Sequence, residues 1–117
     1  EHTIRRNWAI RHQESGLIGS IGLLFLDGLN SHRNEFGYWL GKPFWNQGMM
    51  TRVIDVFSRY CMAQFKYKRL QATVDPRNPA SARILEKNGF SYEGTLKNYN
   101  LKKGQLLDVM MYAIYHQ

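Results

Sequence analysis

Cysteine and long apolar runs are both scarce in this chain of 117 residues. Its one cysteine, Cys61, excludes an internal disulfide framework and a cysteine-cluster metal site, so a reducing cytoplasm is the expected compartment. No apolar run approaches the ~20 residues that cross a bilayer. The segment Glu1–Arg6 lacks a following apolar stretch, and we therefore expect no signal peptide. Membrane-spanning and disulfide-stabilised classes are excluded.

Acidic residues are also few. Nine Asp and Glu stand against 16 Lys and Arg, which gives a formal net charge of +7. Such a chain attracts polyanions: nucleic acid, an acidic protein surface or a phosphorylated cofactor. The basic residues are spread along the chain without an arginine-rich block, so a merely solvated basic surface explains the charge equally well. Charge alone does not select a function.

No repeat, low-complexity tract or Pro/Gly/Ser linker divides the sequence, and its length fits one domain. An apolar fraction of 44% is sufficient for a packed core. We therefore expect residues 1–117 to form a single domain.

The first third of the chain predicts an antiparallel meander. Short strands are expected at Trp8–His12, Leu17–Leu26 and Phe36–Leu40. The polar turn Gln13–Gly16 joins the first two, and a loop over Asp27–Asn34 joins the second and third.

The hydrophobic period then changes from two to between three and four residues, which predicts a helix from about Gln47 to Phe65. Its expected buried face is Met50, Val53, Ile54, Phe57, Cys61 and Phe65.

A strand over Leu70–Val74 and a second helix follow. Asn78 suits the helix N-cap and Pro79 the first helical position, while Asn88 and Gly89 end the helix near Lys87. Two more strands, Phe90–Leu96 and Leu106–Ile114, are joined through residues 102–104. The predicted order is β-β-β-α-β-α-β-β, a mixed α/β layer fold.

Two strand-to-helix junctions, Gly41–Gly48 and Asp75–Asn78, are the expected ligand-binding positions. Ligands of open α/β sheets collect beyond the carboxyl ends of strands. A helix N-terminus there offers unpaired N–H donors and a partial positive charge, both of which favour phosphate.

The sequence at these junctions resembles the GNAT superfamily of N-acetyltransferases. Residues 44–51, FWNQGMMT, stand where that family has its pyrophosphate loop, Q/R-x-x-G-x-G/A. Residues 78–90, NPASARILEKNGF, match the RimJ/RimL form N-x-x-S-x-x-x-L-E-K-x-G-F at every fixed position. The sequence departs from the family at Trp45, Asn46 and Met50. The phosphate donors of such a loop are backbone N–H groups, which do not depend on these side chains.

The resemblance implies a mostly antiparallel sheet with helices on both faces, and acetyl-CoA as co-substrate with no metal. It implies that the backbone of Tyr38, Trp39 and Leu40 pairs with the pantetheine arm, to which Asn78 also bonds. Arg83 is expected to neutralise cofactor phosphates, with an exposed helix arginine as the equal alternative. The expected pyrophosphate-loop residues are Trp45, Asn46, Gln47, Gly48, Met49, Met50 and Thr51.

The same resemblance suggests how acetyl transfer is catalysed. Ser81 would face the cofactor sulfur and protonate the thiolate, although it could also simply reinforce the helix cap. Many family members place a tyrosine acid where this chain has Leu85. Glu35 is the first candidate for the general base and His12 the second; a solvent-facing strand-end carboxylate is the alternative interpretation of Glu35. Cys61 is expected to be a buried thiol rather than a nucleophile.

Family members normally begin with a strand and one or two helices that have no counterpart here. The chain is therefore either a fragment or completed at its edge by another copy, as in a homodimer. The acceptor is expected to be a primary amine, with the N-terminal amine of a ribosomal or other protein as the specific hypothesis. A small-molecule amine acetyltransferase and a non-catalytic acetyl-CoA or RNA-binding module remain as alternatives, although nucleic acid is disfavoured because the aromatic residues follow core-like periods. No membrane partner is expected.

Overall fold

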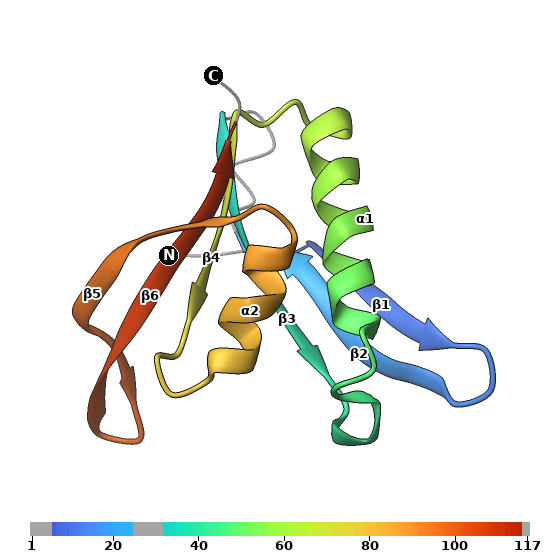
Figure 1. Cartoon of the computed structure of the whole chain (residues 1–117), viewed down its shortest axis with the longest axis horizontal. Helices are drawn as coiled ribbons and strands as arrows, with labels where there is room; N and C mark the ends of the chain where they lie inside the picture. Colours follow the sequence, from blue (N-terminus) through green and yellow to red (C-terminus); the bar gives the residue numbers. More distant parts are fainter. Residues whose placement is uncertain (1–5, 25–31, 116–117) are drawn as a thin grey trace.

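The computed structural model describes residues 6–24 and 32–115. The strands are β1 (Arg6–His12), β2 (Gly16–Leu23), β3 (Arg33–Leu40), β4 (Arg69–Val74), β5 (Ser91–Lys102) and β6 (Gln105–Tyr115). The helices are α1 (Met49–Gln64) and α2 (Pro79–Lys87), and a short 3-10 turn, η2 (Lys42–Phe44), precedes α1 (Figure 1). The predicted order of strands and helices is confirmed.

The described strands form a single sheet in the order β1-β2-β3-β4-β6-β5. Every neighbouring pair is antiparallel except β3 and β4, which run parallel. The parallel pairing is short: it joins Arg33–Glu35 to Arg69–Gln71 and then stops, although β3 continues to Leu40 and β4 to Val74. Beyond these three pairs the two strands diverge in the middle of the sheet.

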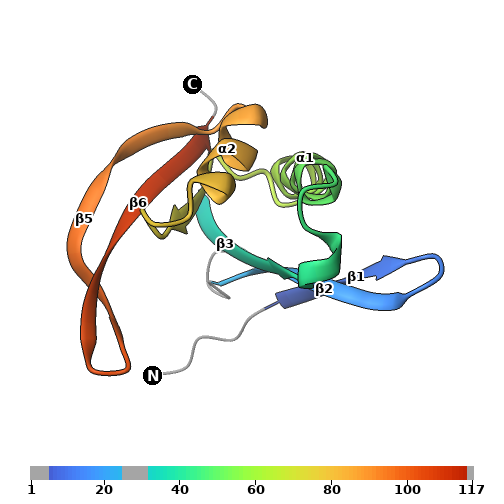
Figure 2. The same ribbon diagram turned by 60° about the horizontal axis from the view of Figure 1, so that its bottom comes forward.

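Both helices pack on the same face of the sheet (Figure 2). Phe36 and Tyr38 project from one face of β3 because strand side chains alternate. The Phe36 ring lies 5.7 Å from that of Phe57 in α1, and the Tyr38 hydroxyl bonds to Ser81 in α2. The expectation of helices on both faces is therefore wrong for the described residues: α1 and α2 share one hydrophobic core on one side.

Helix α1 buries most of the face that its hydrophobic period predicted. Met50, Ile54, Phe57 and Cys61 are buried, whereas Val53 and Phe65 are partly buried against the same core. A fully buried Met, Ile or Phe side chain contributes ~1.5–3 kcal/mol. The helix begins at Met49 instead of Gln47 because Gly48 adopts a left-handed conformation (φ 74°), which ends the preceding loop.

Helix α2 begins and ends as predicted. The Asn78 side chain accepts a hydrogen bond of 3.2 Å from the backbone N–H of Ser81, and Pro79 occupies the first position. Gly89 follows the helix with φ 85°, a left-handed value that favours glycine.

The loop predicted over Asp27–Asn34 ends earlier than expected, because β3 already begins at Arg33. Arg33 and Asn34 belong to β3, because Arg33–Glu35 pairs with a strand 36 residues away in sequence. Asn34 is fully buried, and its side-chain amide donates a 2.9 Å hydrogen bond to the Tyr67 hydroxyl. Residues 25–31, which include the predicted end of the second strand, lie outside the described part of the chain.

Strands β5 and β6 extend beyond the rest of the sheet as a two-stranded arm (Figure 1). Strand β4 pairs with β6 only from Met110 to Tyr115, so residues 105–109 of β6 pair with β5 alone. Strand β5 reaches Lys102 rather than ending at Leu96, and the arm turns at Lys103 and Gly104, both with positive φ. Leu96, Tyr99, Leu101 and Leu106 are exposed along it.

Candidate functional site

A cleft of ≈ 890 Å³ lies where β3 and β4 diverge. The divergence leaves the edge of β3 that faces β4 without a described strand partner after Glu35. The cleft residues come from β3, the loop before α1, the first turns of both helices, the end of β4, and Lys102. They include Phe36, Tyr38, Trp39, Leu40, Trp45, Asn46, Gly48, Met49, Met50, Thr51, Asp75, Asn78, Ser81, Arg83, Lys87 and Lys102. Every predicted cofactor-binding residue except Gln47 therefore lines one hollow.

The loop from Gly41 to Gly48 is fixed by bonds from side chains to its own backbone. The Trp45 indole Nε1 donates to the Leu40 carbonyl at 2.6 Å, and the Gln47 amide donates to the Pro43 carbonyl at 2.9 Å. These contacts explain why Gln47 is absent from the cleft wall. They also show that one of the strand carbonyls expected to pair with pantetheine, that of Leu40, already accepts a hydrogen bond.

Gly48 is required for its backbone conformation rather than for space. A Cβ at this position would meet nothing within 4 Å, yet φ is 74°, a value that β-branched residues rarely adopt. The turn directs the chain from the loop into α1, whose first N–H groups have no partner within the helix. The start of α1 thus presents donors and the positive end of a helix dipole to the cleft.

The charge on the cleft wall is mostly positive. Arg83, Lys87 and Lys102 line it, and Asp75 is the one carboxylate among the described residues that do so. The Arg77 side chain and backbone N–H both bond to Asp75, and these hydrogen bonds hold the pKa of its carboxyl at about 2. Since Asp75 is already paired, the remaining field of the cleft suits an anionic group.

The side chain of Tyr38 is a component of the cleft that sequence reasoning did not select. Its hydroxyl and the Ser81 Oγ form a hydrogen bond across the cleft, from β3 to the first turn of α2. Burial raises the pKa of the Tyr38 hydroxyl, and the bond to Ser81 partly opposes that rise. Because strand side chains alternate, the sequence could predict that Tyr38 and the buried Phe36 lie on the same side of β3. It could not predict that the Tyr38 hydroxyl meets Ser81, because that contact depends on where α2 packs.

Glu35 lies at the point where β3 and β4 part. It is 9% exposed, and its Oε1 accepts a 2.9 Å hydrogen bond from the Gln71 amide. The alternation of β3 places Glu35 on the face opposite Tyr38. The interpretation of Glu35 as a solvent-facing carboxylate is wrong, because the side chain is buried and bonded to Gln71 of β4.

Leu85 and Cys61 do not reach the cleft. Both side chains are 0% exposed and belong to the core beneath the helices. Burial raises the pKa of the Cys61 thiol to about 12, which disfavours the nucleophilic thiolate, and the prediction of a buried thiol is confirmed.

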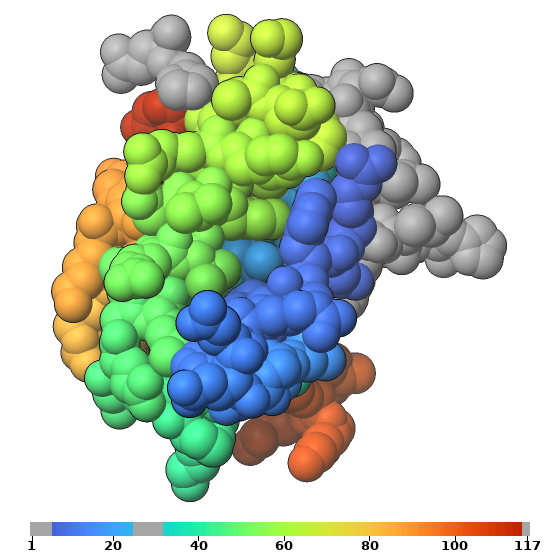
Figure 3. Space-filling model, turned by 90° about the vertical axis from the view of Figure 1, so that its right-hand side faces the viewer, coloured from blue at the N-terminus to red at the C-terminus, as the bar shows by residue number. Residues whose placement is uncertain are grey.

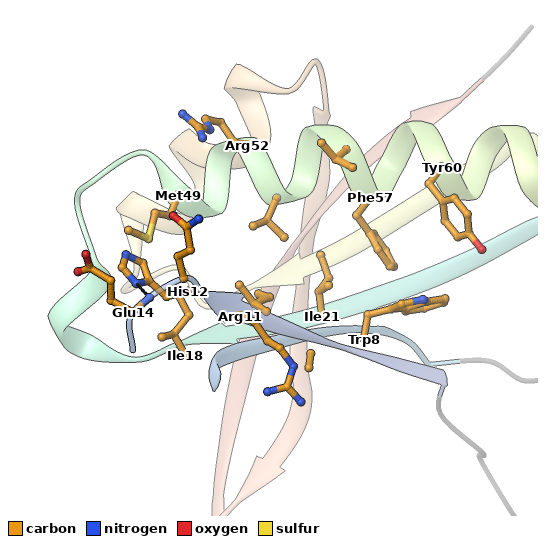
Figure 4. A pocket seen from close by; sticks show the side chains of 15 residues that line it. Trp8, Arg11, His12, Glu14, Ile18, Ile21, Met49, Arg52, Phe57 and Tyr60 are labelled. Carbon is orange, nitrogen blue, oxygen red and sulfur yellow. Dashed lines mark hydrogen bonds between the residues drawn. The ribbon is translucent and has the colours of Figure 1, made fainter. Parts of the chain in front are cut away.

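A second and larger groove, ≈ 1050 Å³, separates the β1–β2 hairpin from α1 (Figure 3). Its floor is apolar, with Ile18 and Ile21 between Trp8 at one end and His12 at the other (Figure 4). Of the predicted cofactor-binding residues, Met49 alone among the described side chains lines it.

His12 belongs to this second groove. Its Nδ1 accepts hydrogen bonds from the backbone N–H groups of Glu14 and Ser15, at 3.1 and 3.3 Å, and its ring lies 5.6 Å from that of Phe44. The structure therefore gives His12 a turn-stabilising position and does not bring it to the cleft with Ser81.

Comparison with known families is consistent with this geometry. The family model described as an acetyltransferase (GNAT) domain matches residues 1–91, more than half of the chain. The chain belongs to the GNAT acetyltransferase family.

Relatives of this GNAT chain include both uncharacterized and named acetyltransferases. An uncharacterized N-acetyltransferase, p20 of Bacillus licheniformis, is 33% identical over 84% of the chain and 54% of its own length. The ribosomal-protein-serine acetyltransferase of Escherichia coli K12 is 29% identical over 86% of the chain and 56% of its own length. The chain thus spans little more than half the length of these relatives.

A solved structure confirms the fold. The F149A mutant of the spermidine N-acetyltransferase SpeG from Vibrio cholerae superposes with a TM-score of 0.83, covering 95% of this chain and 65% of that protein. At 21% identity, the likeness concerns the fold alone.

Two further properties concern the described residues as a whole. Neither helix combines the length and apolar character that a bilayer crossing needs. Residues 6–24 and 32–115 also contain no group of three or more His, Cys, Asp or Glu arranged to hold a metal ion.

Proposed function

We propose that this GNAT chain binds acetyl-CoA in the cleft between β3 and β4 and transfers the acetyl group to a primary amine. The observation that carries the proposal is the convergence, on one basic cleft, of two helix N-termini and an unpaired strand edge. The first turn of α1 suits a pyrophosphate, and the edge of β3 suits the amides of a pantetheine arm.

The binding roles follow from position. The backbone of Gly48, Met49, Met50 and Thr51 would hold the pyrophosphate, with Arg83 as a charge partner. Tyr38 would pair with the pantetheine arm through its backbone, in the manner of an added strand. Trp39 lies opposite Ser20 at a hydrogen-bonded position of the β2–β3 pair, so its backbone groups face β2 rather than the cleft. Asn78 would use the part of its amide that does not cap α2.

The chemistry is direct attack within a ternary complex. The amine nitrogen attacks the thioester carbonyl carbon, a C–N bond forms, and the C–S bond breaks with its electron pair leaving on sulfur. Glu35, acting through a water molecule, would accept the proton that the amine loses. Ser81, at the start of α2, would donate the proton that the thiolate takes up.

We infer that the acceptor is the α-amino group of a protein, with ribosomal proteins as the first candidates. The ribosomal-protein acetyltransferase among the relatives supports this hypothesis. The composition supports it as well, because a polyamine carries several ammonium groups that need several carboxylates, and the nine acidic residues are spread along the chain.

Calorimetry with acetyl-CoA, followed by detection of released thiol with a panel of amines, tests the proposed function. Acetyl-CoA binding and amine-dependent thiol release support it. The absence of acetyl-CoA binding overturns it, and retention of structured RNA on a filter would then favour the RNA-binding alternative. Binding without turnover on any amine leaves a non-catalytic acetyl-CoA module. Intact-mass analysis of a ribosomal-protein extract distinguishes a protein acceptor from a small amine.

We further propose that another segment or a second copy of the chain completes the sheet at β1. Strand β1 is at one end of the strand order, so its outer edge has no partner among the described strands. Such edges favour pairing with another chain. Light scattering that gives a stable dimer supports a second copy, whereas a monomer with full activity contradicts it.

A further inference from the structure

We propose that the Tyr38 hydroxyl is the source of the proton that the departing thiolate receives, and that Ser81 passes it on. The inference rests on the proposed acetyl transfer, and it gives Tyr38 a side-chain role in addition to its backbone role. The sequence motifs single out Ser81 alone; the bond between Ser81 and Tyr38 is a product of the fold.

The two hydroxyl groups are held from independent directions. Tyr38 projects from β3 with its ring stacked on Phe36, at 6.0 Å between centroids and 27° between planes. Ser81 is fixed by the helix start, because its backbone N–H donates to the Asn78 cap. Since 43 residues separate Tyr38 and Ser81, their hydrogen bond depends on the packing of α2 against β3. Both side chains line the cleft and are partly buried.

Acidity explains why Ser81 needs a proton source. A cysteine-like thiol has an ordinary pKa of about 8.5 and a phenol one of about 10, so proton transfer from a phenol to a thiolate is uphill by only about 2 kcal/mol. An aliphatic hydroxyl is a far weaker acid than a phenol, so Ser81 acting alone would become an unfavourable alkoxide. With Tyr38 bonded to its oxygen, Ser81 can give one proton to sulfur while it receives another.

The proton count of this step is balanced. As the C–S bond breaks, the sulfur lone pair takes the proton of the Ser81 hydroxyl, and Ser81 Oγ takes the proton of Tyr38. The negative charge moves from sulfur to the Tyr38 phenolate, which recovers a proton from water after the product leaves. Burial raises the pKa of the Tyr38 phenol, which keeps it protonated before the reaction and also makes it a weaker acid than an exposed tyrosine. The amine proton leaves separately, toward Glu35.

Three variants test the relay: Tyr38→Phe, Ser81→Ala and the double variant. Tyr38→Phe keeps the ring that packs on Phe36 and removes only the hydroxyl. General-acid contributions are typically 10²–10⁴-fold, so we expect each single variant to lower kcat by about 10²-fold. Acetyl-CoA affinity and KM should change by less than about 3-fold, because the two hydroxyls act only in the transition state and do not hold the bound substrates. The double variant should be no slower than the slower single variant, because the two hydroxyls act as one unit.

A proton inventory of kcat in mixtures of H₂O and D₂O separates the relay from a structural role. We expect a curved dependence for the wild-type protein, with two protons in flight, and a linear one for Tyr38→Phe. Tyr92→Phe is the matched control. It also removes a tyrosine hydroxyl bonded to a neighbouring hydroxyl, that of Thr95 at 2.8 Å, but on exposed β5 away from the cleft. Its kcat should equal that of the wild type.

Several results would overturn the relay. If Tyr38→Phe keeps the wild-type kcat, Tyr38 is not the source of the proton. If the losses in the double variant are additive, the two hydroxyls act separately. A loss confined to acetyl-CoA affinity would reduce Tyr38 to a structural contact. Failure of the proposed function is distinguishable, because the wild-type protein itself would then neither bind acetyl-CoA nor release thiol.

Discussion

The side-chain amide of Gln71 on β4 donates a 2.9 Å hydrogen bond to the carboxylate of Glu35 on β3. These two residues form the last of the three parallel pairs before the strands diverge. Both side chains are buried, at 8% and 9% exposure. The bond holds the Glu35 carboxyl at the divergence point, although neither of the two residues is among those that line the cleft.

Glu35→Gln should lower kcat by about 10²-fold at neutral pH if Glu35 is the base. The substitution keeps a side-chain oxygen that can accept from Gln71, so folding should be preserved. For an α-amino acceptor the deficit should shrink as the pH rises above about 8, because the amine then loses its proton without assistance. Steady-state kinetics across this pH range measure the effect.

The control for Glu35→Gln is Glu14→Gln, a change of the same kind in the exposed β1–β2 turn. We expect it to leave kcat unchanged at every pH. A Glu35→Gln protein with wild-type kcat throughout the range would assign the proton transfer to water or to another group.

Gly48→Val should weaken acetyl-CoA binding by at least about 10-fold. A left-handed conformation costs a non-glycine residue roughly 1–2 kcal/mol, and a β-branched one more, so the turn before α1 would shift and misplace its N–H donors. Gly16→Val is the matched control. Gly16 has φ 76° and open space within 4 Å of where a Cβ would lie, like Gly48, but it belongs to the β1–β2 hairpin. Calorimetry should show lost affinity for the first variant alone; equal affinity in both would contradict the proposed phosphate site.

Leu85→Tyr should destabilise the fold and should not create a general acid. Leu85 is 0% exposed, so the larger ring overpacks the core at a cost of roughly 1–3 kcal/mol, and a buried unpaired hydroxyl costs about as much again. Leu85→Met conserves volume and should cost less than about 1.5 kcal/mol. Urea unfolding measures both changes. A stable Leu85→Tyr protein with raised kcat would show that this position can reach the cleft.

Cys61 should react with a thiol reagent only when the protein unfolds. Because the folded thiol has a pKa of about 12 against an ordinary 9.0, its contribution to stability is complete below pH 9. That contribution is lost progressively as the pH rises from 9 toward 12, since the unfolded chain ionises first. Urea unfolding of the wild type and Cys61→Ala should therefore differ most below the ordinary thiol pKa. A difference that stays constant as the pH rises well above it would contradict the pKa assignment.

Local signals were sufficient for most of the fold. The cap at Asn78, the proline after it and the apolar face of α1 each depend on neighbours within a few residues, and the structure confirms all three. The placement of Arg33 and Asn34 in β3 could not be predicted in this way. It depends on parallel pairing with β4 and on the Tyr67 hydroxyl, which satisfies a buried amide.

The sequence could predict the cleft residues as two separate motifs, but it could not predict which side chains of the two motifs contact each other. The sequence indicated Ser81 through its motif, whereas the Tyr38 side chain became visible only when α2 was seen to pack on β3. The face of the sheet on which each helix packs also depends on the whole fold. The expectation of helices on both faces is therefore wrong for the two described helices, which share one core. The sequence placed Glu35 ahead of His12 as the candidate base, but it could not show that Glu35 is buried and bonded to Gln71 or that His12 lies in the other groove.

The arm formed by the outer parts of β5 and β6 has a consequence for the unfolding of the molecule. A two-stranded ribbon alone is marginally stable in water, and from Gln105 to Val109 β6 pairs with β5 and with no other described strand. Its backbone amides should therefore exchange hydrogen for deuterium through local opening, long before those of β4 and α1, which report global unfolding. We expect the arm to open and close as a separate cooperative unit, and Lys102 at its tip, which lines the cleft, to move with it.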